Sequence, residues 1–566
     1  MASIIGKKRG NATYYYLVES ARVNGQPRIV SQEYLGTASE LAAAMRGGGL
    51  GLPARTQHKD FGAVAAAWGM LEDLGVAGII DEVAGARRSD AGASTGTYLA
   101  LAALGRLVAP CSKLAFADWW ATTAAGRFTG IGAPALDHRR FWDAMHAVGL
   151  EELEEISRRI ALAIAGASAV DCSSVALDMT NFATFIDTGN QRAPIAQRGK
   201  AKQKRTDLRL AGLGLVVTRA GGIPLTWHAY PGDKPDVTQF PAMTGVLAAR
   251  HAAICAASGQ EPAEMTVVFD AGQNSGANFA RLAGTGLRYV GPVPASDCPG
   301  LTGLPASARA VVDEDRFGEL TASDTRREVY GAGRRAILTH SPELHDKQAR
   351  GFAGTTLAKA GRKLDELAAT LARGKTRRPR QKVEAEIGKI LHDAWARRVI
   401  AWQLAGDTPK DHRLTWHIDP AARAALEEIF GKHVLITDHD DWPAAEVIAA
   451  YRSQSEAESS FRQMKDPRTA SFSPMFHWTE HNIRVHVFTC VLALQLAHLM
   501  RLKAHRAGLE LSVRALLGGL AGIGETVLLY PGDRGRPRAH RILTDTTPVQ
   551  DKLAKIFGLA RYAPRR

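Results

Sequence analysis

Short apolar runs, interrupted by only two helical segments, make up the chain between residues 170 and 300, and they restrict the fold more than any other feature. Three runs come first without a helix between them, and helices and strands then alternate. Three adjacent strands followed by such an alternation predict a mixed α/β sheet. The predicted strands are 174–185, 208–218, 223–230, 265–270 and 287–290, and the predicted helices are 237–257 and 277–283.

The regions outside this sheet differ from it and from one another. Residues 14–35 alternate β-forming residues around Asn24-Gly25, which predicts a hairpin. The Gly-rich segment 46–55 is typical of a linker, and residues 443–465 predict one helix with proline in its first turn. We expect six parts: a small β module at 1–45, a helical domain at 60–168, the first part of an α/β core at 170–300, an inserted β and helical domain at 301–415, the second part of the core at 416–505 and a basic domain at 506–566.

Composition narrows the range of functions. The chain has 566 residues, 45% of them hydrophobic, and its 71 Lys and Arg exceed its 57 Asp and Glu by a formal charge of +14. These values exclude a disordered chain and an acidic coat-like protein, and five scattered cysteines without a C-x-x-C pair argue against a disulfide scaffold or zinc knuckle. The positive charge indicates a polyanionic partner, most simply nucleic acid. It is concentrated in 501–566, with 13 basic and 5 acidic residues, and in 188–206, with six basic residues and no acid.

The apolar segments of the chain do not predict membrane insertion. No apolar run follows the first lysines, so no signal peptide is expected. The segment 63–80 is interrupted by Glu72 and Asp73, and 485–500 has the length of a buried core helix. We therefore expect a cytoplasmic protein without a membrane span.

Two aspartates at apolar strands are the first candidates for chemistry. Asp178 lies within the run 175–182, and Asp270 ends the run 266–270. A strand inside a core tolerates a carboxylate only where its charge is paired or bound to a metal. Two such aspartates on neighbouring strands would converge and hold a divalent cation through hard oxygen ligands. The alternative for each is an ordinary turn or N-cap aspartate, which suits Asp270 in particular.

A third carboxylate lies in the predicted helix 443–465. Tyr451, Glu458 and Lys465 are spaced by seven residues and therefore share one face, with Gln454 and Arg462 beside it. Such a face suits a metal-bound phosphate, because the carboxylate binds the cation while lysine and tyrosine contact phosphate oxygens. Glu456 is about 200° around the helix from Glu458 and should point away. The alternative is a solvated amphipathic helix with an ordinary Glu–Lys pattern.

These residues resemble a known family. The spacing Tyr451-x2-Gln454-x3-Glu458-x6-Lys465 is similar to the Y-(2)-R-(3)-E-(6)-K signature of insertion-sequence DDE transposases, except that glutamine replaces the arginine. The blocks at 177–182, 207–236, 267–272 and 432–438 resemble further segments of the same family in the same order. The aspartates are 92 residues apart, whereas 188 residues separate Asp270 from Glu458. A direct connection needs far fewer residues, which argues for an inserted domain.

The resemblance implies an α/β fold with an RNase H-like mixed-sheet catalytic core, an inserted domain, and a β module and helical domain before the core. It implies Asp178, Asp270 and Glu458 as catalytic and metal-binding residues, with two Mg²⁺ ions for which Mn²⁺ can substitute. The activity implied is cleavage of DNA at the inverted repeats of an insertion sequence, followed by strand transfer. The implied partners are double-stranded transposon ends and target DNA, bound by a homodimer in the bacterial cytoplasm or nucleoid.

Candidate DNA contacts surround this site. Tyr451 and Lys465 take the family's phosphate-binding roles, and the vacant arginine role passes to Arg452 or Arg462. The basic segment 188–206 would contact phosphate without reading sequence, although its composition also describes a solvated loop. Its members among the candidates are Arg198, Lys200, Lys202, Lys204 and Arg205. Arg139, early in a predicted helix of the region 60–168, is a weaker candidate for reading DNA ends, since a solvated basic helix face has the same pattern.

Three other interpretations remain open. His477-Trp-Thr-Glu-His481 matches the short H-x-x-E-H zinc pattern, but the match is weak and ordinary surface or capping histidines explain it better. An RNase H-like nuclease or resolvase would cleave DNA without joining it. A domesticated DNA-binding protein would keep the core only as a scaffold, but the presence of all three acids argues against this.

Overall fold

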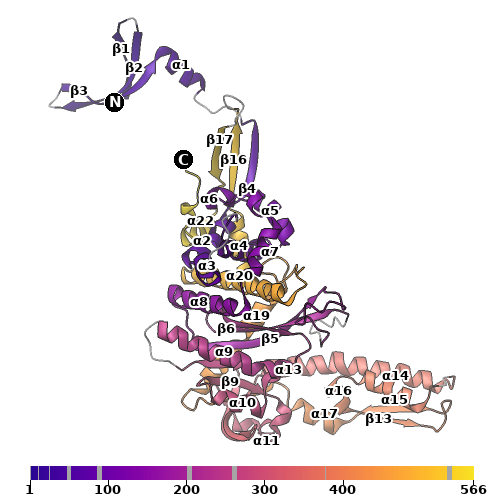
Figure 1. Ribbon diagram of the computed structural model, residues 1–566. Coiled ribbons are helices and arrows are strands. Elements are labelled where there is room, and N and C mark those ends of the chain that lie inside the picture. The colour runs from indigo at the N-terminus through magenta and orange to yellow at the C-terminus, as the bar shows by residue number, and fades with distance from the viewer. Residues whose placement is uncertain are drawn as a thin grey trace. The chain divides into compact units, whose positions relative to one another are not determined.

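The computed structural model describes residues 1–566 except 1, 11, 24–25, 48–52, 86–91, 201–206, 258–263, 376–377, 532–537 and 566. The chain divides into two compact units (Figure 1). The first unit consists of Met1–Ala66, Asp118–Ala133 and Ala515–Arg566, and the second consists of Ala67–Ala117 and Pro134–Arg514.

A nine-stranded mixed sheet forms the centre of the second unit. Its strand order is β10-β11-β12-β15-β9-β8-β5-β6-β7. Strand β5 pairs antiparallel with β6 and parallel with β8, and β8 pairs parallel with β9. All five predicted strands are present, so the predicted α/β class is confirmed. The bounds are β5 Ser174–Thr184, β6 Arg209–Thr218, β7 Pro224–Pro231, β8 Thr266–Phe269, β9 Arg288–Val293, β10 Ala310–Val311, β11 Thr321–Val329, β12 Ala332–His340 and β15 Lys432–Thr437.

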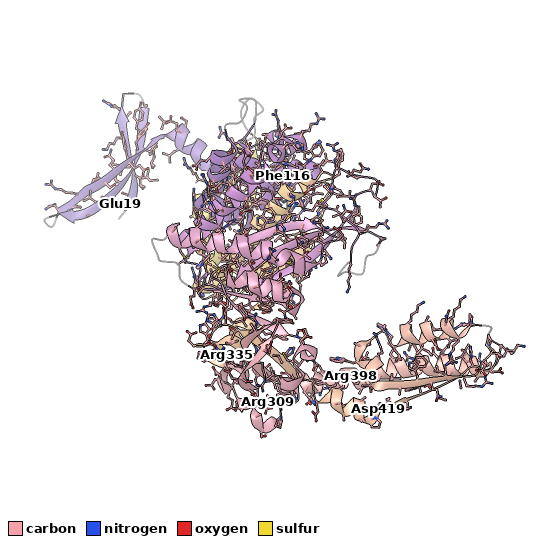
Figure 2. All side chains as sticks on the ribbon, turned by 60° about the horizontal axis from the view of Figure 1, so that its bottom comes forward. Glu19, Phe116, Arg309, Arg335, Arg398 and Asp419 are labelled. Atoms are coloured by element: carbon pink, nitrogen blue, oxygen red, sulfur yellow. The ribbon has the colours of Figure 1, made fainter. Side chains whose placement is uncertain are left out.

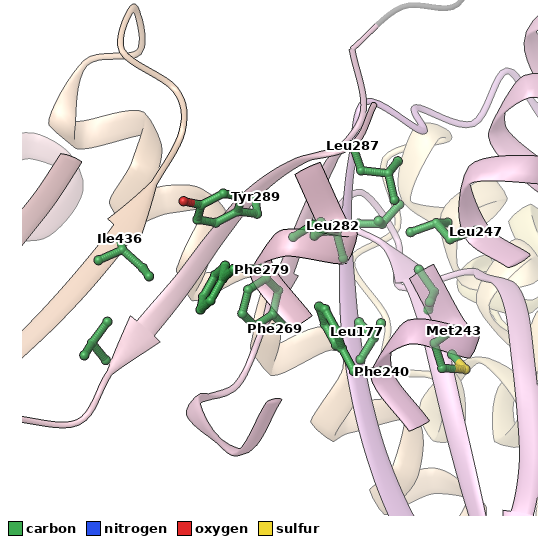
Figure 3. Packing of buried hydrophobic residues seen from close by; sticks show 14 of the residues in the cluster. Leu177, Phe240, Met243, Leu247, Phe269, Phe279, Leu282, Leu287, Tyr289 and Ile436 are labelled. Carbon is green, nitrogen blue, oxygen red and sulfur yellow. The ribbon is translucent and has the colours of Figure 1, made fainter. Parts of the chain in front are cut away.

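Both faces of this sheet are covered, which explains why its strands are apolar throughout. Every residue of β6 and of β8 is buried. On one face, Leu177 and Met179 pack with helices α9 (Asp236–Ala257) and α10 (Gly276–Ala283), as Figure 3 shows for Leu177, Phe240 and Phe279. On the other face, Ala176 and Phe182 pack with α19 (Gln454–Lys465) and α20 (Glu480–Arg506). Alternation along β5 therefore turns Asp178 toward the α19 side.

Helices precede the sheet in the chain, as predicted for the region 60–168. They pack through apolar faces, and α4 is buried along nearly its whole length. The helices are α2 Gly62–Asp73, α3 Val76–Ala84, α4 Thr95–Val108, α5 Lys113–Thr122, α6 Ala125–Thr129, α7 His138–His146 and α8 Leu150–Ser168.

The inserted segment is shorter than the predicted 301–415. Strands β10–β12 belong to the large sheet, because β12 pairs with β15 from Arg335↔Thr437 to His340↔Lys432. A separate hydrophobic cluster is formed by buried residues between Phe352 and Phe430. Arg398 and Asp419 mark this segment in Figure 2. Its elements are α13 Pro342–Gly351, a π-helical turn Phe352–Leu357, α14 Ala358–Ala372, α15 Arg380–Ile390, α16 Ala394–Val399, β13 Ile400–Ala405, β14 Arg413–Ile418 and α17 Pro420–Glu427.

The first unit contains two three-stranded sheets. Strands β1 (Ala2–Arg9), β2 (Ala12–Val23) and β3 (Gln26–Thr37) form one sheet, followed by α1 (Ala38–Gly47). Strands β2 and β3 pair antiparallel on either side of Asn24-Gly25, whose own placement lies outside the described residues.

The second sheet of this unit joins distant parts of the chain. Its strands are β4 (Arg55–Asp60), β16 (Gly524–Tyr530) and β17 (Arg538–Leu543), with α21 (Val513–Ala521) and α22 (Pro548–Ile556) nearby in the sequence. The C-terminal region is therefore not a separate domain as predicted, because β16 pairs with β4 from the N-terminal region.

Helices α9 and α20 are long and apolar enough to cross a membrane by length and composition, and so, among the described residues, are two bent pairs, α2–α3 and α4–α5. Helix α20 has 27 residues, so the apolar run 485–500 lies within a longer helix. Its most apolar window is 94% buried within the protein, which accounts for its composition, whereas the corresponding window of α9 is 33% buried.

Candidate active site

Asp178 enters the site from the middle of β5. It follows Leu177 and precedes Met179, both fully buried on the opposite face, while its own side chain is half-buried. Its Oδ1 accepts a hydrogen bond of 2.7 Å from the Met179 amide. The carboxylate is therefore held by a strand whose flanking residues are fixed in the core.

Asp270 is placed beside Asp178 by the parallel pairing of β5 with β8. The register pairs Leu177 with Phe269, so each aspartate follows one member of the same pair. Asp270 Oδ1 accepts a hydrogen bond of 2.8 Å from the Ala271 amide and caps a short 3₁₀ helix, Ala271–Gln273. The N-cap interpretation from the sequence is thus correct, and the same exposed carboxylate also faces the site.

Glu458 is exposed on α19, which packs Ala457, Phe461 and Met464 against the sheet. The predicted single helix 443–465 is wrong, because Ser453 separates α18 (Ala444–Arg452) from α19. Gln454, at the start of α19, is buried and donates from Nε2 to the Leu177 carbonyl at 2.9 Å. This bond fixes the beginning of α19 to β5 one residue before Asp178.

The three carboxylates line one pocket of about 230 Å³. Its lining residues are Asp178, Asp270, Tyr451, Arg452, Gln454, Ser455 and Glu458. The pKa of Tyr451 is raised by burial and, to a smaller extent, by the negative charges of Asp270 and Glu458. Tyr451 therefore stays protonated at neutral pH and lies close enough to both carboxylates to sense their charge.

The donor chemistry of this pocket suits a hard divalent cation, since carboxylate oxygens are the preferred ligands of Mg²⁺. In Asp178 and in Asp270, one carboxylate oxygen accepts a hydrogen bond from a main-chain amide. Among the described residues, no three His, Cys, Asp or Glu side chains are arranged to hold one metal ion as they stand. The pocket gathers the three carboxylates without arranging them as a metal site.

The other predicted phosphate contacts are distributed around the pocket. Arg452 lines it, with its guanidinium 4.5 Å from the Phe317 ring centroid. Lys465 Nζ donates to Thr180 Oγ1 at 2.8 Å, on the same face of β5 as Asp178. Arg462 is exposed on α19, and it is not among the described residues that line the pocket.

Glu456 points away from the carboxylates, as predicted. Its Oε2 accepts from Arg501 Nη2 at 2.9 Å on α20. Glu456 lies on the same helix as Glu458 but pairs with an arginine outside the pocket.

The basic segment 188–206 is described only in part. Arg198 and Lys200 are exposed, and the Lys200 carbonyl accepts a 3.0 Å hydrogen bond from Asn181 Nδ2 on β5. The segment thus leaves the sheet next to the strand that carries Asp178. Lys202, Lys204 and Arg205 lie outside the described residues.

The zinc interpretation of His477 and His481 is not supported. His477 precedes α20 in an irregular segment, and burial beside Lys113 and Arg106 lowers its pKa to about 3. His481 lies within α20 and its Nε2 is 2.9 Å from the Met145 carbonyl. The two residues do not lie on one helix, so the i, i+4 geometry is lost.

The sequence did not predict Ser455 as a pocket residue or the structural role of Gln454. Ser455 lines the pocket, and Gln454 contributes a buried amide where only a vacant arginine role was considered. Gln454 Oε1 has no hydrogen-bond partner among the described residues.

No protein-family description and no curated protein matches this chain. Among solved structures, it is similar to the piggyBac transposase in a cryo-EM structure of a synaptic complex with hairpin DNA, with a TM-score of 0.37 and 8% identity over 83% of this chain and 82% of that chain. These values are too low for the likeness to establish a shared fold or function.

Proposed function

We propose that this protein is a DDE-type DNA transposase that cleaves DNA at the ends of its own insertion sequence and joins them to target DNA. The observation that carries the proposal is the gathering of Asp178, Asp270 and Glu458 in one pocket. These residues come from three distant segments, in the order and with the surrounding spacing that the family resemblance requires.

The topology around the pocket supports an RNase H-like core. The part β7-β6-β5-β8-β9 consists of three antiparallel strands followed by two parallel ones. This is the arrangement expected of that fold, with the first aspartate on its central strand. The remaining strands β10, β11, β12 and β15 extend the sheet at the β9 edge.

The chemistry proposed is in-line phosphoryl transfer. Asp178, Asp270 and Glu458 would hold two Mg²⁺ ions, which supply charge stabilisation at the attacking and leaving oxygens. Tyr451 remains a neutral hydrogen-bond donor and Arg452 a cation, and both suit non-bridging phosphate oxygens. Lys465 is held next to the pocket by Thr180. No covalent intermediate on the protein is required.

DNA binding is supported by exposed positive charge beside β5. Arg198 and Lys200 are exposed beside the strand that carries Asp178. Contacts of this kind bind phosphate independently of sequence and weaken with salt. We place recognition of transposon ends in residues 60–168, where Arg139 is exposed near the start of α7. We expect two copies of the chain to pair the two ends.

The test is incubation of the purified full-length protein with a supercoiled plasmid carrying the DNA that flanks this reading frame on both sides. The expected products are ends cut at the flanks and joined to a second plasmid, only when Mg²⁺ or Mn²⁺ is present. Cutting without joining would favour a nuclease or resolvase. Activity in EDTA, or cleavage that ignores the flanking DNA, would overturn the proposal.

A further inference from the structure

A second pocket lies away from the carboxylates, within the same unit of the chain. It has a volume of about 610 Å³, which is within the range of small-molecule sites. Its lining is basic and aromatic, and no Asp or Glu occurs among the described residues that form it. The residues used below are Arg106, Lys113, Trp142, Phe476, Trp478 and Asn482.

Two cations are buried in the wall of this pocket. Arg106 is 3% exposed and Lys113 is 7% exposed. Arg106 Nη2 donates to the Pro474 carbonyl at 2.8 Å, but its Nη1 is buried without a partner among the described residues. Lys113 Nζ lies 5.5 Å from the Phe141 ring centroid, and no carboxylate of the described residues is among the charges that shift its pKa. A buried arginine without a counter-anion is costly, and burial lowers the pKa of Lys113 to about 7, so an anionic ligand would favour the charged form of both side chains.

Helix ends add positive potential to the same wall. Helix α5 starts at Lys113, and the Ser112 hydroxyl caps it at the Ala115 amide. Helix α20 starts at Glu480, after the N-cap Thr479, and Asn482 in its first turn lines the pocket. The positive ends of two helices favour an anion at this point. The buried Asn482 Oδ1 also lacks a partner in the described residues, so the site offers an unused acceptor as well.

Aromatic rings border the pocket and remain exposed to solvent. Phe476 is 73% exposed, Trp478 is 54% exposed and Trp142 is 42% exposed. The Arg192 guanidinium lies 4.4 Å from the Trp478 ring centroid and steadies that ring. Exposed rings next to a cationic wall match a ligand with one flat aromatic part and one anionic part.

We propose that this pocket binds a nucleotide, with its phosphate against Arg106 and Lys113 and its base against the rings of Phe476 and Trp478. An unpaired nucleotide at the end of a DNA strand and a free mononucleotide share this chemistry. The inference does not depend on the proposed strand cleavage, because none of these residues lines the carboxylate pocket.

The test measures binding to the full-length protein by titration calorimetry in EDTA, where metal-dependent binding at the carboxylates is removed. The probes are thymidine monophosphate, thymidine and inorganic phosphate. The monophosphate should bind at least tenfold more tightly than either fragment. Equal affinity for thymidine and its monophosphate, or no binding at millimolar concentration, would overturn the proposal.

Paired variants separate the two halves of the site. Lys113→Met should weaken the monophosphate and phosphate at least tenfold, whereas Lys432→Met removes a partly buried lysine elsewhere and should change neither. Trp478→Ala should weaken the monophosphate about tenfold and leave phosphate unchanged. Trp402→Ala removes a tryptophan on β13 that is 39% exposed, and it should have no effect. Equal losses from Trp478→Ala and Trp402→Ala would overturn the aromatic assignment.

The binding test does not depend on whether Lys113→Met folds. If Lys113→Met fails to fold, Trp478→Ala and Phe476→Ala decide, because more than half of each ring is exposed. A 5′-phosphorylated octathymidylate distinguishes the two sources. If the octathymidylate binds more tightly than thymidine monophosphate, and Trp478→Ala removes this difference, the pocket holds the end of a DNA strand. If the two ligands bind equally, the pocket holds a free nucleotide. If the protein binds a blunt DNA duplex more tightly than the octathymidylate and the monophosphate, and this binding also depends on Trp478, the ligand is not an unpaired nucleotide.

Discussion

Gln454 Nε2 and the Leu177 carbonyl are joined by a hydrogen bond of 2.9 Å that fixes α19 to β5 next to Asp178. The bond is buried, and the other end of the amide, Oε1, has no partner in the described residues. Glu458 lies one helical turn after Gln454, so the distance between the Asp178 and Glu458 carboxylates depends on this bond. Gln454 acts here as a positioning residue.

Replacing Gln454 by methionine should therefore slow DNA cleavage more than it affects stability. The loss of one hydrogen bond costs about 1 kcal/mol, whereas displacement of Glu458 should reduce the single-turnover cleavage rate at least tenfold and raise the Mg²⁺ concentration needed for half-maximal rate. Gln454→Arg keeps a donor for the Leu177 carbonyl and should recover part of the rate. An unchanged Mg²⁺ dependence in Gln454→Met would contradict the positioning role.

The two glutamates of α19 provide a matched pair for the carboxylate site. Glu458→Gln should abolish cleavage and leave DNA binding intact, because it removes one of the three carboxylates proposed to bind metal and no packing contact. Glu456→Gln should cleave normally, since Glu456 pairs with Arg501 outside the pocket. Cleavage of a labelled end and a gel-shift assay measure both properties. Normal cleavage by Glu458→Gln together with loss in Glu456→Gln would reverse the assignment of the helix face.

The central sheet was predictable because its signal is local. Strands β6 and β8 are buried along their whole length, so their apolar runs stand out in the sequence. The pairing of β12 with β15 was not predictable, because about a hundred residues separate them and Arg334 and Arg335 make β12 look exposed. The pairing of β4 with β16 joins opposite ends of the chain, and no local sequence pattern indicates it.

Only those residues of the carboxylate pocket that stand out by their spacing along the chain could be predicted from the sequence. Asp178 and Asp270 stand out against apolar neighbours, and their strands pair in parallel. The helix break at Ser453 has no strong signal, because neither glycine nor proline marks it. Arg106 and Lys113 of the second pocket were not predicted. Arg106 is a single cation in the apolar helix α4, and the sequence does not show that both cations are buried without a neighbouring acid.

Tyr451→Phe separates a phosphate contact from a covalent nucleophile. The ring keeps its packing and only the hydroxyl is lost, so cleavage should fall about tenfold and remain dependent on Mg²⁺. Burial and the nearby carboxylates raise the pKa of Tyr451, which makes its phenolate scarce at neutral pH. Complete loss of cleavage, with a protein–DNA adduct that forms only in the wild type, would contradict this role.

Glu525 stabilises the first unit as a buried acid between two arginines. Its side chain is fully buried, and it accepts from Arg127 Nη2 at 2.5 Å and from Arg541 Nη1 at 3.2 Å. Glu525→Gln should lower the stability of this unit by about 2–3 kcal/mol, because it leaves the arginines without a counter-charge. Circular dichroism melting tests this, with the exposed Asp545→Asn as the control. Equal melting of both variants would show that the ion pair is not stabilising.

Lys113 should make stability depend on pH in a narrow window. Burial lowers its pKa to about 7, with a smaller contribution from Arg106, compared with 10.5 in the unfolded chain. Between pH 7 and 8.5 the unfolded state therefore binds more protons at Lys113 than the folded state, and stability rises with pH by at most about 1.4 kcal/mol per unit. Burial raises the pKa of the neighbouring Cys111 and Cys490 thiols, so these two groups oppose the trend toward pH 8.5, where the unfolded thiols begin to lose their protons.

The comparison of wild type with Lys113→Met isolates this contribution. Melting midpoints in buffers free of phosphate and sulfate should rise from pH 7 to 8.5 in the wild type and stay flatter in the variant, whose side chain cannot ionise. Adding sulfate, which does not titrate in this range, should stabilise the wild type most at pH 7, where Lys113 still carries charge. Parallel profiles for the two proteins would show that Lys113 keeps an ordinary pKa and is not a buried cation held without a partner.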